Sequence, residues 1–238
     1  MIDFIQKSRY DFQDLRKLVS LLRSDSGCPW DREQTHASIR RNFLEEVYEA
    51  CEGIDLDDPQ LMEEEFGDVL LQVVFHTDIE EDAGRFTMDD VCDRVCKKLI
   101  FRHPHLFAGV SAEDWDWEEM KKQEKGVETQ TQVLSSVARS LPALIRADKL
   151  SGKLGKMGCT WPDAQAALDA ARDALAAPGD PQTQLGSVLF ALAGACKLLE
   201  LDPESALHAA CETVIENFAR AEETGISPQQ LQTRQLLP

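Results

Sequence analysis

The sequence predicts an all-α protein built from two tandem helical bundles, the second a degenerate copy of the first. Ala, Leu, Glu, Lys, Arg and Gln dominate the chain, and no Asn-Gly or Asp-Gly hairpin signal stands between alternating runs. An echo of short motifs in the second half indicates the duplication. With 238 residues, of which 43% are apolar, the chain is long enough to bury a core.

The first half is expected to hold four helices. An apolar stripe of helical period forms the first, and Gly27 and Pro29 break the chain after it. Thr35 and Thr87 are suited to cap later helices, and Pro104 cannot continue the hydrogen-bond ladder of the last one. These signals predict helices at residues 12–23, 36–54, 60–82 and 88–103.

The second half repeats features of the first. GCTW at 158–161 echoes GCPW at 27–30, and GSVL at 186–189 echoes GDVL at 67–70, in the same order and at similar separation. The preserved order of two echoes favours an old tandem duplication over chance. The sequence therefore predicts two domains, residues 1–131 and 132–238.

Charge and composition exclude several classes of partner. Lys and Arg total 25 against 43 Asp and Glu, and a net charge of −18 repels phosphate backbones and anionic lipids, so we expect no nucleic-acid or membrane partner. The longest clean apolar run, 188–196, is far short of the roughly 20 residues that a membrane helix needs. The first ten residues lack the pattern of a signal peptide, and seven scattered cysteines fit reduced, buried thiols. A cytoplasmic location is expected.

Acidic residues recur three apart on the two central helices of the first half. Glu46 with Glu49, and Glu65 with Asp68, each share one helix face. A short turn at 57–59 makes these helices antiparallel neighbours, which lets the two pairs face each other. Four carboxylates are therefore predicted to converge.

Two interpretations of these acids are open. In an acidic chain such pairs usually mark a solvated helix face, and on the second helix the apolar stripe lies roughly opposite the acids. The third helix favours the other interpretation, because apolar residues surround its circumference over 66–75, which is typical of a buried helix. Buried carboxylates demand a cation, and neither segment offers an obvious Arg or Lys. Oxygen ligands select Mg²⁺ or Mn²⁺.

Basic and aromatic residues also have two interpretations. Lys98 and Arg102, four apart at the end of the fourth helix, complement its dipole or bind phosphate oxygens. Trp30 and Trp117 belong to the core or rim, or they stack on a base. None of these residues identifies a function by itself.

Five motifs stand in order along the first half: GCPWD at 27–31, LEEVYE at 44–49, EFGDVLLQVVF at 65–75, GRF at 84–86 and RHPHLF at 102–107. Together they resemble the MazG family of nucleoside triphosphate pyrophosphohydrolases. RSLPAL at 139–144 resembles the segment that joins the two domains in that family. The resemblance implies MazG-like helical bundles, a homodimer, and Mg²⁺-dependent hydrolysis of a nucleoside triphosphate substrate to the monophosphate and pyrophosphate.

The resemblance also implies roles for individual residues. The expected metal ligands are Glu46, Glu49, Glu65 and Asp68. The expected catalytic residues are Glu45, as the assisting base, and Glu46. The expected substrate contacts are Lys98, Arg102, Trp30, Trp117 and Lys121, the last two in a flap. Just before Arg102, where the family has a basic residue, this chain has Phe101.

The second half departs from the family pattern. Ala170, Gln184 and Ser187 stand where the first domain has metal ligands, so we expect this domain to be inactive. Two alternatives for the whole chain stay open. One is a catalytically silent nucleotide-sensing or helical interaction protein, and the other is a narrower pyrophosphohydrolase of dUTP, dCTP or phosphoribosyl-ATP.

Overall fold

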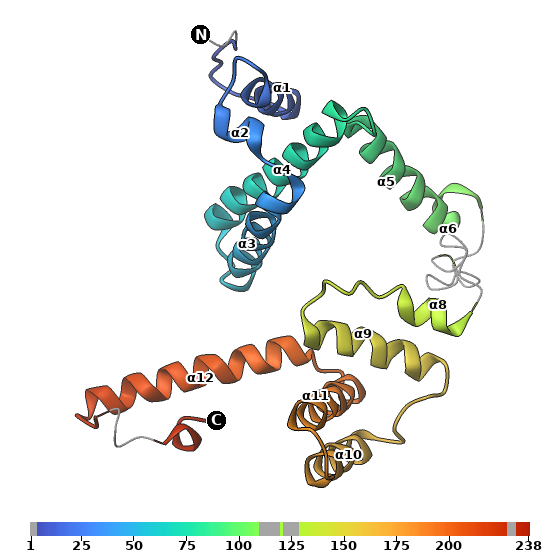
Figure 1. The fold of residues 1–238 in the computed structure, drawn as a ribbon, viewed down its shortest axis with the longest axis vertical. Coiled ribbons are helices and arrows are strands. Elements are labelled where there is room, and N and C mark those ends of the chain that lie inside the picture. The colour runs from blue at the N-terminus through green and yellow to red at the C-terminus, as the bar shows by residue number, and fades with distance from the viewer. Residues whose placement is uncertain (1–3, 110–119, 121–128, 228–231) are drawn as a thin grey trace. The chain divides into compact units, whose positions relative to one another are not determined.

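The structure, a computed structural model, describes residues 4–109, 120, 129–227 and 232–238. The described residues form helices and loops without a strand, which confirms the all-α prediction (Figure 1). The chain divides into two compact units, residues 1–120 and 121–238.

The first unit contains the four predicted helices and two short ones. They are α1 (Phe12–Arg23), α2 (Pro29–Glu33), α3 (His36–Asp55), α4 (Pro59–Asp82), α5 (Met88–Arg102) and α6 (Pro104–Phe107). Thr35 and Thr87 cap α3 and α5, because each hydroxyl accepts a backbone N–H of the first turn. The break predicted at Gly27 and Pro29 holds the short helix α2, which begins at that proline.

Helices α3 and α4 lie side by side and are joined by a turn of a few residues (Figure 1). Asp57 in the turn has a φ of 51°, in the left-handed region. Asp58 then caps α4 by accepting the backbone N–H groups of Gln60 and Leu61. Gly53 allows the helices to approach, since a Cβ there would lie 3.1 Å from a backbone nitrogen of α4. The turn thus fixes the register of the antiparallel pair.

The core of the first unit is small and is continued by a buried ion pair. Its buried apolar residues are Val19, Ile39, Val74, Phe75 and Met88. Beside them, the guanidinium of Arg23 lies 5.1 Å from the Phe75 ring centroid and donates to Asp78 and Asp82 of α4, both at 2.8 Å. Apolar contacts and charge together attach α1 to α4.

A polar cluster ties the start of α3 to the end of α4. The Glu80 carboxylate accepts Arg85 Nε–H at 2.5 Å and is hydrogen-bonded to the His36 ring. These partners lower the pKa of Glu80 to about 2. His36 Nδ1 also lies 2.7 Å from His76 Nδ1, and the His76 ring packs on Phe43. Burial, followed by the charge of His36, lowers the pKa of His76.

Two expectations about burial are wrong. The segment 66–75 of α4 is not buried all round in the single chain, because Phe66 is 51% and Leu70 is 40% exposed. The seven cysteines are free, but five of them are exposed and the other two are half-buried. Both errors concern apolar side chains that helical periodicity assigns to a stripe without saying what covers that stripe.

The second unit is a series of helices around a close pair. Its elements are α8 (Gln130–Ser135), α9 (Ala143–Lys156), α10 (Ala164–Ala176), α11 (Pro181–Leu198), α12 (Pro203–Glu223) and the 3₁₀ helix η3 (Thr233–Gln235). Helices α10 and α11 pack together, and their buried residues are almost all alanine: Ala167, Ala171, Ala191, Ala193 and Ala195. The contact of Gly194 with Trp161 requires a glycine, because an added Cβ would lie 2.1 Å from the ring.

The membrane test gives a negative result for each helix taken alone. No single described helix is long and apolar enough to cross a bilayer. Helices α11 and α12 meet the requirements of length and apolarity only when they are taken together, and the chain bends by 106° between them.

Candidate metal centre

Three carboxylates meet between α3 and α4. One oxygen atom each of Glu46, Glu49 and Glu65 can be chosen so that the three atoms lie within 4.8 Å of one another. Glu46 and Glu49 are one turn apart on α3, and Glu65 comes from the facing turn of α4. The α3–α4 turn therefore brings three of the four acids predicted to converge into one cluster, and Asp68 is not among them.

Glu46 belongs to the face of α3 that packs against α4. The buried residues of this helix, Ile39, Ala50 and Gly53, recur at helical spacing, and the half-buried Glu46 lies on the same face. On the other side of α3, the apolar stripe predicted from the sequence is exposed and consists of Leu44, Val47, Tyr48 and Cys51. The acid thus points toward protein and the apolar stripe points outward.

Glu65 is the most enclosed acid of the cluster. Its side chain is buried, and its Oε2 atom has no hydrogen-bond partner. Burial, followed by the charges of Glu49 and Asp68, raises the pKa of Glu65. Burial and the charge of Asp68 raise the pKa of Glu46 in the same way. An orphaned carboxylate oxygen among like charges fits a cation.

Asp68 and Gln72 continue the stripe of α4 that begins with Glu65. Asp68 is half-buried, and its charge acts on both Glu46 and Glu65. The Gln72 side chain lowers the pKa of Glu46, while its own Oε1 atom is buried without a partner. The sequence places Gln72 on this stripe, four residues after Asp68, but gives it no function.

The donor set fits a hard divalent cation. Within the described part of the chain, no ion pair joins Lys, Arg or His to Glu46, Glu49, Glu65 or Asp68. All four candidates offer carboxylate oxygens, which are ligands that Mg²⁺ and Mn²⁺ accept. A divalent ion would compensate the charges that otherwise repel one another.

Glu45 lies beside the cluster without joining it. Its side chain is exposed and accepts the Nε–H of Arg41 at 2.7 Å, one turn earlier on α3. Only its charge reaches the cluster, where it contributes to the raised pKa of Glu46. Sequence reasoning did not detect the Arg41 pair.

The single chain does not bring the expected substrate-binding residues to the acids. Lys98 and Arg102 are half-buried in the last turns of α5, which leaves α4 at a sharp bend and ends away from α3 (Figure 1). Trp30 lies in α2 and is 60% exposed. Trp117 and Lys121 fall outside the described residues.

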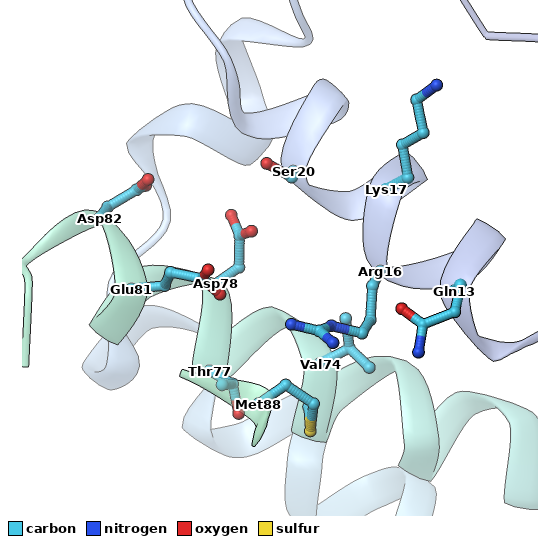
Figure 2. A pocket seen from close by; sticks show the side chains of 10 residues that line it. All are labelled: Gln13, Arg16, Lys17, Ser20, Val74, Thr77, Asp78, Glu81, Asp82 and Met88. Carbon is cyan, nitrogen blue, oxygen red and sulfur yellow. The ribbon is translucent and has the colours of Figure 1, made fainter. Parts of the chain in front are cut away.

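A separate pocket of about 350 Å³ lies between α1 and α4 (Figure 2). The charged ends of Arg16 and Asp78 point into it, whereas Lys17 points away. Arg16 is paired with Asp89 at 2.9 Å, and Asp78 is paired with Arg23. The residues that line this pocket include none of the clustered acids, so it is distinct from the candidate metal centre.

The second unit has no comparable arrangement among its described residues. Ser187 donates its hydroxyl to the Thr183 carbonyl at 2.9 Å, and Gln184 donates to the carbonyl of Ala177. The three-carboxylate cluster in the described part of the chain comes from the first unit alone. The polar groups at the corresponding positions are therefore used in local backbone contacts.

Comparison with known proteins gives consistent matches. The sequence profile of the MazG nucleotide pyrophosphohydrolase domain matches residues 34–107, which include the three clustered acids and Asp68. The nucleoside triphosphate pyrophosphohydrolase/pyrophosphatase MazG of Thermotoga maritima is 36% identical over 219 residues, 89% of this chain and 86% of the relative. The nucleoside triphosphate pyrophosphohydrolase of Escherichia coli K12 is 35% identical over 214 residues, 83% of this chain and 81% of the relative.

Proposed function

Because the chain belongs to the MazG family of nucleotide pyrophosphohydrolases, we propose that it hydrolyses nucleoside and deoxynucleoside triphosphates to the monophosphate and pyrophosphate. The observation that carries this proposal is the buried, unpartnered Oε2 atom of Glu65 beside two further carboxylates. The proposed ligands of a Mg²⁺ ion, with Mn²⁺ as a substitute, are Glu46, Glu49, Glu65 and Asp68.

The chemistry follows from these positions. A bound divalent ion supplies charge that draws triphosphate oxygens to the acids and lowers the pKa of a coordinated water. Hydrolysis requires that water attack the α-phosphorus, that its proton pass to a carboxylate, and that the bond to pyrophosphate break. We assign the proton acceptor to Oε atoms of Glu45 or Glu46, which are adjacent on α3. Glu45 must first leave Arg41 to serve in this way.

The proposal includes a homodimer. Phe66 of α4 and Leu99 of α5 are 51% and 46% exposed, and a second copy would remove such apolar area from water. A second copy also supplies a route by which Lys98 and Arg102 reach the acids, since the bend before α5 separates them within one chain. There they would neutralise charge on the leaving pyrophosphate. For Trp30, Trp117 and Lys121 we propose further substrate contacts.

We further propose that residues 1–131 form the catalytic domain and that residues 132–238 are a degenerate, inactive copy. The support is chemical, because Ala170, Gln184 and Ser187 cannot supply the carboxylates that the first domain offers. A cytoplasmic location is part of the proposal, and the free cysteines support it.

The test is pyrophosphate release from a panel of ribonucleoside and deoxyribonucleoside triphosphates, with Mg²⁺, with Mn²⁺ and with a chelator. We expect turnover with either ion and none with the chelator. Nucleotide binding without turnover under all conditions would instead indicate a silent nucleotide-sensing protein. Turnover of one nucleotide alone would replace the broad substrate class by a narrower one.

A further inference from the structure

Gln72 is a polar residue of the α3–α4 interface that the proposed reaction does not use. It lies one helical turn after Asp68, on the stripe of α4 that also carries Glu65. Its side chain acts on the Glu46 carboxylate and lowers the pKa of that group, which places the Gln72 amide beside the acid cluster. It is therefore a neighbour of the proposed metal ligands and not one of them.

The other end of this amide has no partner. Gln72 Oε1 is buried and accepts no hydrogen bond, as is also true of Glu65 Oε2 on the same stripe. One turn later on this stripe, His76 is hydrogen-bonded to His36 and packs on Phe43. The two orphaned oxygens thus belong to one side of α4, the side that faces Glu46.

A buried amide oxygen without a donor destabilises a folded protein, because it has lost its hydrogen bonds to water. An apolar side chain of similar length, such as methionine, would avoid this cost. The orphaned oxygen is explained if a further molecule donates to it when the site is in use. Beside a cluster of carboxylates that fits a hydrated cation, the available donor is water bound to that cation.

We propose that Gln72 is a positioning residue of the metal centre: when the ion is bound, its Nε2–H group orients the Glu46 carboxylate and its Oε1 accepts a hydrogen bond from a water of the ion. This inference rests on the proposed function, since it presupposes a divalent ion among the acids. Outer partners of this kind fix the orientation of a ligand and so raise the affinity for the metal.

The test is a titration of the full chain with Mn²⁺ in the absence of nucleotide. Binding is measured as the loss of the electron paramagnetic resonance signal of free Mn²⁺. Gln72→Met removes the amide and keeps the length of the side chain, and Gln60→Met makes the same change at an exposed position of α4. We expect Gln72→Met to weaken Mn²⁺ binding by about 10- to 100-fold. We expect Gln60→Met to bind as the wild type does.

A second measurement separates positioning from a structural role. In a chelator, the melting temperature of Gln72→Met should equal or exceed that of the wild type, because the variant no longer buries an unpartnered oxygen. If the variant loses both Mn²⁺ affinity and metal-free stability, Gln72 is structural and the inference is overturned. Gln72→Leu repeats both measurements if the methionine variant does not fold.

The remaining outcomes distinguish this inference from the proposed function. If the wild type binds Mn²⁺ and Gln72→Met binds it equally well, only the role of Gln72 is overturned. If the wild type binds no Mn²⁺, or if Glu65→Gln binds it as tightly as the wild type, the metal centre itself is overturned.

Discussion

Arg23 of α1 donates its Nε–H to the Asp78 carboxylate of α4 at 2.8 Å, and the two side chains are only 7% and 12% exposed. Burial raises the pKa of Asp78 in spite of the guanidinium beside it, because the loss of water outweighs the attraction. The pair closes the junction between α1 and the α3–α4 hairpin that carries the acid cluster. Removing one partner would leave a buried charge without compensation.

We therefore predict that Arg23→Leu lowers the free energy of unfolding by about 3 kcal/mol. Urea denaturation followed by circular dichroism measures this change. Adding Asp78→Leu should restore part of the loss, since the orphaned carboxylate is then gone. The exposed pair of Arg41 and Glu45 is the control, and Arg41→Leu should change stability by less than about 0.5 kcal/mol. Equal losses in both single variants would contradict the distinction.

Glu80 is expected to make the free energy of unfolding depend on pH. Arg85 and His36 lower its pKa from 4.5 to about 2, so its contribution is complete above pH 4.5 and disappears as the pH falls through about 2. We predict that Glu80→Gln is less stable than the wild type at pH 7 and that the difference shrinks between pH 4.5 and 2. Urea denaturation across this range measures the difference. A difference that stays constant with pH would show that the charge of Glu80 is not responsible.

The proposed metal ligands should be essential for turnover and not for folding. Glu46→Gln and Asp68→Asn each remove a charged ligand and conserve volume, so we predict loss of pyrophosphate release with an unchanged helical spectrum. Glu63→Gln, on an exposed position of the same helix as Asp68, serves as the control and should keep full activity. Activity at the wild-type level in either ligand variant would remove that residue from the site.

The same acids should destabilise the protein when the ion is absent. Burial and the charges of Glu49 and Asp68 raise the pKa of Glu65, which means that its ionised form is unfavourable in the folded chain. We predict that Glu65→Gln raises the melting temperature in a chelator and lowers it, relative to the wild type, at saturating Mg²⁺. Differential scanning calorimetry under both conditions makes the comparison. The same sign of change in both conditions would be inconsistent with a metal-compensated cluster.

Turnover should not change when residues of the second unit that correspond to the proposed metal ligands are substituted. Ser187 corresponds to Asp68 in the motif echo, and its hydroxyl is bonded to its own helix. We predict that Ser187→Ala leaves kcat and KM for every accepted nucleotide unchanged, in contrast to Asp68→Asn. A fall in kcat for Ser187→Ala would assign the second unit a direct part in the reaction.

Local signals in the sequence predict the helices well, and tertiary relations are harder to predict. Thr35 and Thr87 mark helix starts because a hydroxyl cap acts within one turn. The exposure of Phe66 was not predictable from periodicity, since an apolar stripe has the same pattern whether the chain itself or another molecule covers it.

The candidate site shows the same limit. The convergence of Glu46, Glu49 and Glu65 follows from helix spacing and a short turn, so it was predictable. The proximity of Gln72 to Glu46 depends on how α3 and α4 pack, and the position of Lys98 depends on the bend before α5. Neither relation can be predicted from the spacing of residues along one helix.

The alanine contacts between α10 and α11 imply that the two units differ in their need for a divalent ion. Methyl groups pack against each other without an ion, so α10 and α11 should fold together in the absence of divalent cations. Under the same conditions the carboxylates between α3 and α4 repel one another. Under the proposed function, a shortage of magnesium would therefore loosen the first unit and leave the second intact. Added magnesium would then restore the first unit without any unfolding of the second.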